Sequence, residues 1–292
     1  MKPPIFVIGN PRSGTTILRL MLTCHQNIVI PPECGFAVWL FSRYKDWIYQ
    51  HKYVRLSRLV DDVMSCRKIE TWGIDRWELL DYLKQKSPSD WPQAVSFIYE
   101  YYGILQGSDF TRWGDKNNFY LNHIPVIKEM FPDAFFIHIV RDGRNVACSY
   151  KRLNRLALNS KYSPRFPKSI EEIADSWQQN IMTILTAFEV FDFEDVVEVR
   201  LEDLTQRPKE ELARVCECLG EEFDPRMLEY NRITIERNLE PQEFLKWKDK
   251  IHLPLTSEGQ YEYKRTLSTV EIDTYEKIAG EILRRYNYLN YT

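Results

Sequence analysis

Three short apolar runs rich in β-branched residues punctuate this chain, and a helical pattern follows each of them. The runs are IFVIG (5–9), AFFIHIV (134–140) and DVVEVR (195–200), and the helical patterns begin at Thr15, Gly143 and Pro208. Near-continuous apolar strands that alternate with helices are typical of a parallel sheet covered on both faces. FTRWGDK (110–116) is expected to add a fourth strand. The sequence therefore predicts an α/β fold with a parallel sheet flanked by helices.

The remaining stretches predict which segments surround this sheet. Residues 36–109 have long helical periods dense in aromatics and are expected to form a helical insertion over the sheet edge on the acceptor side. Its aromatics either form core or line an acceptor pocket. Residues 231–263 are expected to be irregular, and a terminal amphipathic helix follows, with Ser268 as N-cap and Glu271 three residues on. One domain spanning 1–292 accommodates all of these parts.

Composition restricts the class of partner. The formal net charge of -3 gives no general attraction to nucleic acid or to an acidic membrane, so any anion site must be local. No apolar run reaches the roughly 18 to 20 residues of a membrane span, and no secretory leader is evident, so a cytoplasmic enzyme is expected. The histidines and cysteines lack metal-ligand spacing, so no metal is expected. The sequence leaves a homodimer open.

The turn after the first run, GNPRSGTT (9–16), has the spacing of a phosphate-binding loop without its lysine. A glycine-rich turn between strand and helix directs backbone N–H groups and the positive end of the helix dipole at one anion. Thr15 stands in the lysine position, and the nearest cation is Arg12. Such a loop suits an anion with less charge than a triphosphate and no obligatory metal. A plain turn that caps the helix is the alternative.

A second anion motif follows the 134–140 run. Arg141 lies at the end of the strand and Ser149 lies eight residues later, about two turns into the helix. A guanidinium offers a bidentate fork for phosphate, and a serine hydroxyl adds one donor, so both could bind one phosphate. The alternative is that Arg141 and Asp142 only cap the helix with a surface ion pair.

PRSGTT and VRDGRNVACSY together resemble the motifs of sulfotransferases that use 3′-phosphoadenosine 5′-phosphosulfate (PAPS), particularly the bacterial and tyrosylprotein branches. This family has a P-loop-like fold, and its first motif holds the 5′-phosphosulfate and its second the 3′-phosphate. The resemblance implies that Arg141 and Ser149 bind the latter. It implies that the following residues bind the former: Arg12, Ser13, Gly14, Thr15 and Thr16.

The resemblance extends towards the C-terminus. VRLEDL (199–204) is similar to a V-R-Y-E-D-L segment of the family, although Leu201 stands where many members have a tyrosine that touches the cofactor. YKRTLS (263–268) resembles the family's W-R-R-E-L-S segment, which implies that Lys264 and Arg265 contact the cofactor. Trp113, Trp177 and Trp247 are candidates to stack on adenine, with core packing as the alternative for each.

The resemblance also implies the catalytic groups. Glu33 follows Arg12 by 21 residues, the separation of the catalytic arginine and glutamate in the tyrosylprotein branch, and would act as the base. Arg12 would also neutralise the leaving oxygen, and Lys116 in WGDKNN would reach the transferring group from the other side. The alternatives are a solvated Glu33, an exposed Lys116 paired with Asp115, and a histidine base. His25 and His123 are the nearest histidines.

The expected function is transfer of a sulfuryl group from PAPS to a hydroxyl, or with lower preference an amine, leaving adenosine 3′,5′-bisphosphate (PAP). A small molecule, a glycan or a peptide tyrosine could accept the group. A P-loop nucleotide or small-molecule kinase is the rival enzyme class, and a catalytically inactive nucleotide-binding module is the third interpretation. The absent loop lysine and the lack of a clear Mg²⁺-binding aspartate after a strand count against the kinase.

Overall fold

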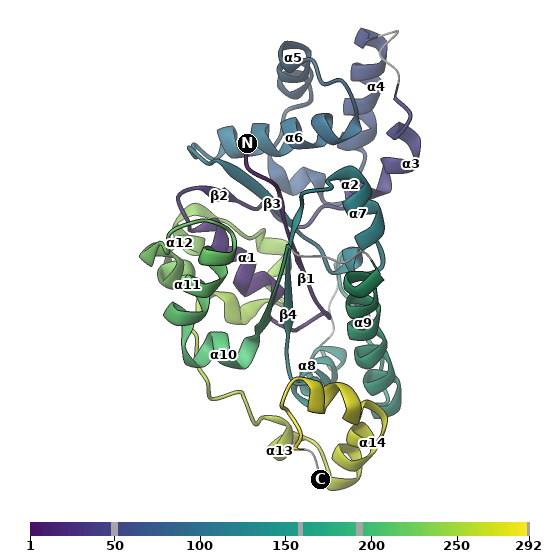
Figure 1. The fold of residues 1–292 in the computed structure, drawn as a ribbon, viewed down its shortest axis with the longest axis vertical. Coiled ribbons are helices and arrows are strands. Elements are labelled where there is room, and N and C mark those ends of the chain that lie inside the picture. The colour runs from purple at the N-terminus through teal and green to yellow at the C-terminus, as the bar shows by residue number, and fades with distance from the viewer. Residues whose placement is uncertain (48–51, 157–159, 191–194, 291–292) are drawn as a thin grey trace.

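The computed structural model describes residues 1–47, 52–156, 160–190 and 195–290, and its centre is a parallel sheet with the strand order β2-β3-β1-β4-β5 (Figure 1). The strands are β1 (Ile5–Ile8), β2 (Ile28–Val29), β3 (Arg112–Lys116), β4 (Phe135–Val140) and β5 (Val196–Arg200). Four of them lie where strands were predicted, three in the apolar runs and one in FTRWGDK, and the predicted α/β class is confirmed. The two-residue β2 at the sheet edge was not predicted.

Alternate side chains of β1 pack into two different hydrophobic cores, one on each face of the sheet. Ile5 and Val7 pack with the helices on one face, whereas Phe6 and Ile8 join a cluster on the other. Because successive side chains of a strand point to opposite faces, this pattern requires cover on both sides of the sheet. All four side chains are at most 1% exposed. The central strand is therefore rigidly held, and so is the turn that follows it.

Helices supply that cover on both faces (Figure 1). One face carries α1 (Thr15–Thr23), α10 (Leu201–Gln206), α11 (Pro208–Cys218) and α12 (Tyr230–Arg237). The other carries α7 (Ile124–Met130), α8 (Gly143–Asn154), α9 (Ile170–Val190) and α14 (Thr269–Arg285). Ser268 and Glu271 form the expected capping box of α14. The shorter helices are η3 (Asn118–Asn122), η4 (Pro225–Glu229), η5 (Gln242–Phe244), η6 (Asp249–His252) and α13 (Tyr263–Thr266).

The described residues of the stretch 36–109 are mostly helical and lie beyond the β2–β3 edge of the sheet, at the top of Figure 1. It contains α2 (Phe36–Trp39), α3 (Phe41–Tyr44), α4 (Lys52–Met64), η2 (Ile69–Trp72), α5 (Arg76–Lys86) and α6 (Trp91–Leu105). Helix α6 packs on β3, where the rings of Tyr99 and Trp113 stack at 4.2 Å. Much of the aromatic content of this region therefore forms core.

The prediction that 231–263 is irregular is wrong for its first part, which belongs to α12. Two features stabilise this helix. Tyr230 and Ile233 are buried in the core shared with α1. Arg232 pairs with Glu229 and Glu236, at i,i+3 and i,i+4 spacing on its exposed side. Beyond α12 the chain makes only short turns of helix before α14.

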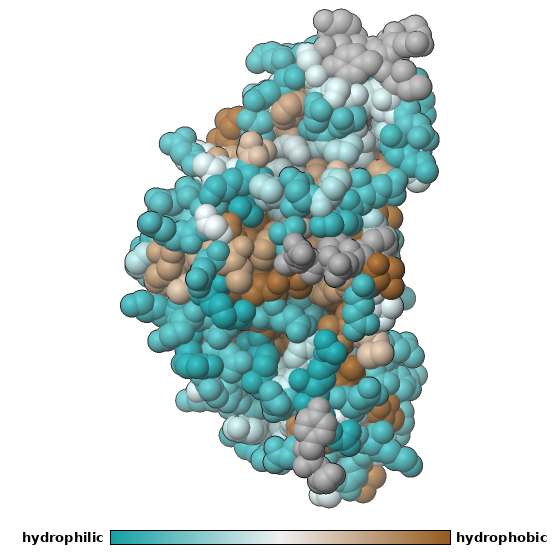
Figure 2. Space-filling model, viewed as in Figure 1, coloured by the Kyte–Doolittle hydropathy of each residue, from teal (hydrophilic) through white to brown (hydrophobic). Residues whose placement is uncertain are grey.

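One face of the molecule is predominantly hydrophilic, with hydrophobic residues gathered at mid-height, level with the strands of Figure 1 (Figure 2). Within the part of the chain that the structure describes, no helix is both long and apolar enough to cross a membrane.

Candidate active site

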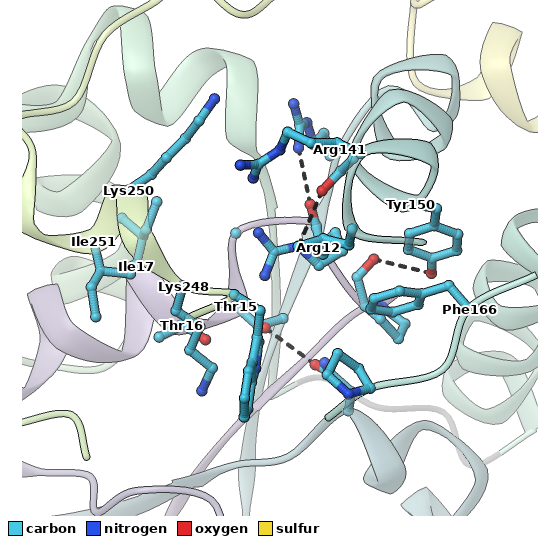
Figure 3. A pocket seen from close by; sticks show the side chains of 18 of the residues that line it. Arg12, Thr15, Thr16, Ile17, Arg141, Tyr150, Phe166, Lys248, Lys250 and Ile251 are labelled. Atoms are coloured by element: carbon cyan, nitrogen blue, oxygen red, sulfur yellow. Dashed lines mark hydrogen bonds between the residues drawn. The ribbon is translucent and has the colours of Figure 1, made fainter. Parts of the chain in front are cut away.

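A cavity of about 1620 Å³ opens beyond the carboxyl ends of β1, β3 and β4 (Figure 3). It is lined by residues of both anion motifs and by the proposed base, namely Arg12, Thr15, Thr16, Glu33, Arg141 and Ser149. In the close-up, Arg12 and Arg141 lie near its centre, between Lys248 with Thr16 on one side and Tyr150 with Phe166 on the other. The polar turns after the strands thus meet at one site, as expected for a parallel sheet.

The first loop turns sharply before α1. Arg12 and Gly14 both have left-handed backbone conformations, with φ of 72° and 96°. A non-glycine residue at positive φ is uncommon and points to a backbone that its surroundings hold in place. Thr15 donates a hydrogen bond to Asn118 at 3.1 Å, and the Oγ of buried Ser13 has no partner within the described residues. The conformation of the loop is therefore fixed by the protein itself, and the hydroxyl of Ser13 remains without a hydrogen-bond partner within the described residues.

The second motif contacts the first directly. The guanidinium Nε of Arg12 donates to Oγ of Ser149 at 3.1 Å, and Nη1 of Arg141 donates to the carbonyl oxygen of Arg12 at 3.2 Å. Asp142 accepts from the backbone of Arg144 as the cap of α8, and its carboxylate pairs with the Arg144 guanidinium at 2.7 Å. Arg141 is thus directed at the first loop and the cavity.

Glu33 lies among three lysines. Its Oε1 accepts a hydrogen bond from Lys116 and lies 3.8 Å from Nζ of Lys248, and its Oε2 accepts from Lys68 at 2.6 Å. Burial favours the neutral acid, but the three ammonium groups outweigh it and hold the pKa of Glu33 well below its usual range. Glu33 is therefore an ionised, paired carboxylate, which differs from the solvated loop residue of the alternative interpretation.

Lys116 connects Glu33 to the first loop. Its ammonium also donates to Oγ1 of Thr16 at 3.1 Å, and its side chain is 1% exposed. Burial lowers the pKa of Lys116 to about 8, although Glu33 beside it favours the charged form. This position differs from the exposed lysine of the alternative interpretation. Asp115 points elsewhere: its carboxylate accepts hydrogen bonds from Tyr99 and Tyr120 in the aromatic core.

Two of the lysines around Glu33 were not predicted. Lys68 comes from the helical insertion, just before η2, and Lys248 comes from the segment before η6. Lys248 is also bound to Glu240, whose other oxygen accepts from Arg19 of α1 at 2.7 Å. No local motif marks these lysines, because their partners are distant in sequence.

Several predicted residues lie away from the cavity wall. Lys264 is exposed with its ammonium 4.9 Å from the Tyr261 ring, and Arg265 is exposed and donates to the carbonyl of Glu258 at 3.4 Å. Neither is among the cavity-lining residues. His25 bonds to the carbonyl of Glu222 at 2.8 Å, and His123 stacks on Phe119.

The three candidate tryptophans are distributed differently. Trp113 and Trp177 are core residues, at most 2% exposed, whereas Trp247 lines the cavity. Leu201, at the position where many family members have tyrosine, also lines the cavity. In the described residues no three His, Cys, Asp or Glu side chains gather as metal ligands would.

A sequence model described as "Sulfotransferase family" matches residues 3–225. The chain belongs to the sulfotransferase family. This confirms the resemblance carried by the two anion motifs. Protein-tyrosine sulfotransferase A of Caenorhabditis elegans is 21% identical to this sulfotransferase over 286 residues, covering 98% of this chain and 67% of the relative. Omega-hydroxy-beta-dihydromenaquinone-9 sulfotransferase Stf3 of Mycobacterium bovis is 30% identical over 262 residues, covering 78% and 66%.

Solved structures show the same fold as this sulfotransferase. The sulfotransferase domain from the curacin biosynthetic pathway superposes with a TM-score of 0.59 at 19% identity, covering 97% of this chain and 98% of that one. The sulfotransferase domain of the Synechococcus PCC 7002 olefin synthase gives 0.57 at 22% identity and covers 96% of both chains. Mouse sulfotransferase SULT7A1, crystallised with PAP, gives 0.51 at 14% identity, covering 99% and 86%.

Proposed function

We propose that this sulfotransferase moves a sulfuryl group from PAPS to a hydroxyl acceptor, with Glu33 as the base. One observation carries the proposal: Lys116 joins Glu33 to Thr16 of the first loop, and Arg12 of the same loop is bonded to Ser149 of the second motif. A base, a loop for a phosphosulfate and a site for a further phosphate thus share one cavity. The cavity is large enough for a nucleotide together with an acceptor.

The donor would lie across the two motifs. The first loop and the N-terminus of α1 offer backbone N–H groups to the phosphosulfate. Arg141 and Ser149 would bind the 3′-phosphate, the group that ATP lacks. Arg12 and Lys116 supply the positive charge that Mg²⁺ provides in nucleoside triphosphatases, so the proposed reaction needs no metal.

The chemistry follows from this placement. Glu33 accepts the proton of the acceptor hydroxyl, whose oxygen bonds to sulfur as the bond from sulfur to the bridging phosphate oxygen breaks. Arg12 and Lys116 stabilise the negative charge that develops on that phosphate oxygen, which leaves as part of PAP. An anionic donor also competes with Glu33 for Lys116. Donor binding therefore makes Glu33 more basic.

The acceptor is proposed to be a small molecule, a glycan or a peptide tyrosine. The named relatives support a peptide tyrosine and a small molecule, since one is a protein-tyrosine sulfotransferase and another acts on a hydroxylated menaquinone. In this chain Tyr162, Phe244 and Trp247 line the cavity and form a hydrophobic cluster with Leu153. These residues favour an acceptor with a flat or apolar part.

Donor choice is tested by thermal unfolding with nucleotides. PAP without metal is expected to stabilise the protein, by about 2.7 kcal/mol at a concentration one hundred times its dissociation constant. Arg141→Ala is expected to weaken this effect, whereas Arg207→Ala, at an exposed side chain outside the cavity, is the control. Stabilisation by ATP only in the presence of Mg²⁺ would instead indicate a kinase.

The role of Glu33 is tested by Glu33→Gln, which keeps the size of the side chain and removes its basicity. Turnover is expected to fall by about 10² to 10⁴-fold, the usual contribution of a general base, while PAP still stabilises the variant. Glu236→Gln, at a half-exposed side chain on α12, is the matched control. Normal turnover of the Glu33 variant would exclude this residue as the base.

A further inference from the structure

Both carboxylate oxygens of Glu33 accept hydrogen bonds from lysines. Lys116 donates to Oε1 and Lys68 donates to Oε2. A base must offer an oxygen to the acceptor hydroxyl within hydrogen-bond reach. If Glu33 acts as proposed above, one of its ammonium partners has to leave when the acceptor arrives.

Lys68 is the partner best placed to leave. Lys116 is fully buried and also holds Thr16, and Lys248 is held by Glu240, which is itself clamped by Arg19. The side chain of Lys68 is 19% exposed, and its ammonium lies 5.2 Å from the centre of the Phe244 ring in the cavity wall. It can therefore move into the cavity without breaking a second ion pair.

The backbone of Lys68 indicates that its direction is imposed by the fold. Its φ of 77° is left-handed, which is uncommon for a lysine and costs of the order of 1 kcal/mol or more. The η2 turn that follows is fixed in the core by Ile69 and Trp72, and the indole of Trp72 donates to the carbonyl of Pro32 at 2.9 Å, next to Glu33. The helical insertion thus aims Lys68 at the loop that carries Glu33.

Two carboxylates beside this part of the cavity wall are already paired. Glu70 accepts from Lys161 and Tyr162, and Glu240 accepts from Lys248 and Arg19. The guanidinium of Arg67, the neighbour of Lys68, lies over the Tyr162 ring at 5.1 Å and adds further positive charge. A cation released into this partly desolvated wall needs a counter-ion. The donor is proposed to lie across the two anion motifs, so an anionic group on the acceptor is the counter-ion expected at the wall formed by Phe244 and Tyr162.

We propose that Lys68 recognises a negatively charged group on the acceptor, moving from Oε2 of Glu33 to that group and so exposing the oxygen that takes the hydroxyl proton. The acceptor is then a hydroxyl compound that carries a carboxylate or a similar anion beside a flat ring, which packs on Phe244 and Tyr162. Lys68 is in this sense a specificity residue that also positions the base. The inference rests on the proposed function.

Matched probes test this with PAP-saturated protein in isothermal titration. The probes are 4-hydroxyphenylacetate and 4-hydroxyphenylacetamide, which share a phenol and differ in charge. Wild type is expected to bind the carboxylate at least about tenfold more tightly, the usual effect of one hydrogen bond to a charged group. Lys68→Gln is expected to abolish this preference and Lys68→Arg to retain part of it. Lys84→Gln, at an exposed lysine of α5, should match wild type.

A second measurement does not depend on the probes. In carbon-13 NMR of labelled glutamate, Lys68→Gln should raise the pKa of Glu33, because one of its three cations is lost, whereas Lys84→Gln should leave it unchanged. Equal binding of the two probes to wild type, binding of neither, a preference that survives in Lys68→Gln, or an unmoved pKa of Glu33 would each overturn the inference. Failure of PAP to bind wild type, seen before any probe is added, would instead overturn the proposed function.

Discussion

Glu240→Gln should destabilise the protein strongly, although this residue is not among those lining the cavity. The Glu240 side chain is 2% exposed, and its two oxygens pair with Arg19 and Lys248, which are 1% and 8% exposed. Glutamine keeps the shape but removes the charge, so buried Arg19 loses its counter-ion and buried Lys248 keeps only Glu33, at 3.8 Å. Arg19 keeps its bonds to the carbonyl oxygens of Ile30 and Leu239.

The magnitude follows from burial. Removing one partner of a buried ion pair typically costs about 3 to 5 kcal/mol, because the remaining charge is left desolvated and unpaired. An exposed pair is worth at most about 1 kcal/mol. Glu236 pairs with Arg232 on the surface of α12, with side chains 52% and 57% exposed, so Glu236→Gln makes the same chemical change at an exposed site.

The sign of the pH dependence is also fixed. Burial alone would raise the pKa of Glu240, but Lys248 and Arg19 outweigh it and lower that pKa below its ordinary value. The stabilisation by this carboxylate is therefore present above the unfolded pKa of about 4.3 and is lost as the pH falls through the folded pKa. The difference between wild type and Glu240→Gln should shrink in acid.

Urea unfolding followed by tryptophan fluorescence measures both effects. At pH 7 we expect Glu240→Gln to lower the free energy of unfolding by several kcal/mol and Glu236→Gln to leave it almost unchanged. Equal, small effects of the two substitutions at pH 7 would refute the idea that the Arg19–Glu240–Lys248 cluster is a buried ionic network.

Two further substitutions test the parts that hold the site. Burial raises the pKa of Asp115 to about 7, so wild type should lose about 2 to 3 kcal/mol of stability relative to Asp115→Asn as the pH rises from 5 to 8. A constant difference in urea unfolding at several pH values would contradict this. Gly14→Ala should cost about 1 to 3 kcal/mol through its φ of 96° and weaken PAP binding, since the new Cβ would lie 2.7 Å from Cδ1 of Leu201. Gly73→Ala is the control, because Gly73 has a positive φ with open space around it, so its thermal unfolding measures the backbone cost alone. An unchanged PAP affinity in Gly14→Ala would argue against the loop as the donor site.

The sheet was largely predictable because β1 and β4 are apolar on both faces, β5 is rich in valine, and each of these strands ends in a polar turn. β2 could not be found, because Ile28–Val29 is too short to show a pattern of its own. Helix α10 was missed for a different reason: Leu201–Gln206 begins directly after the last residue of β5, and its helical period merges with the strand.

The residues of the site were predictable only where they lie close together in one sequence motif. Arg12 and Thr16 lie in one loop, and Arg141 and Ser149 both follow β4 within nine residues of its end, so motifs reveal them. Lys68 meets Glu33 across 35 residues and through the packing of the insertion, which no spacing rule encodes. Lys264 and Arg265, expected from the C-terminal segment, lie outside the cavity wall, and a structure with bound donor would test their role.

The end of β3 ties the outer helical layer to the reaction centre. Its last two side chains point in opposite directions, Asp115 towards Tyr99 of α6 and Lys116 towards Glu33. Exchanging the insertion for that of a relative would therefore remove the Tyr99 hydroxyl and leave buried Asp115 with Tyr120 as its hydroxyl partner, directly beside the ammonium that contacts the base. An engineer who wishes to change acceptor preference has to treat residues 36–116 as a single exchangeable unit.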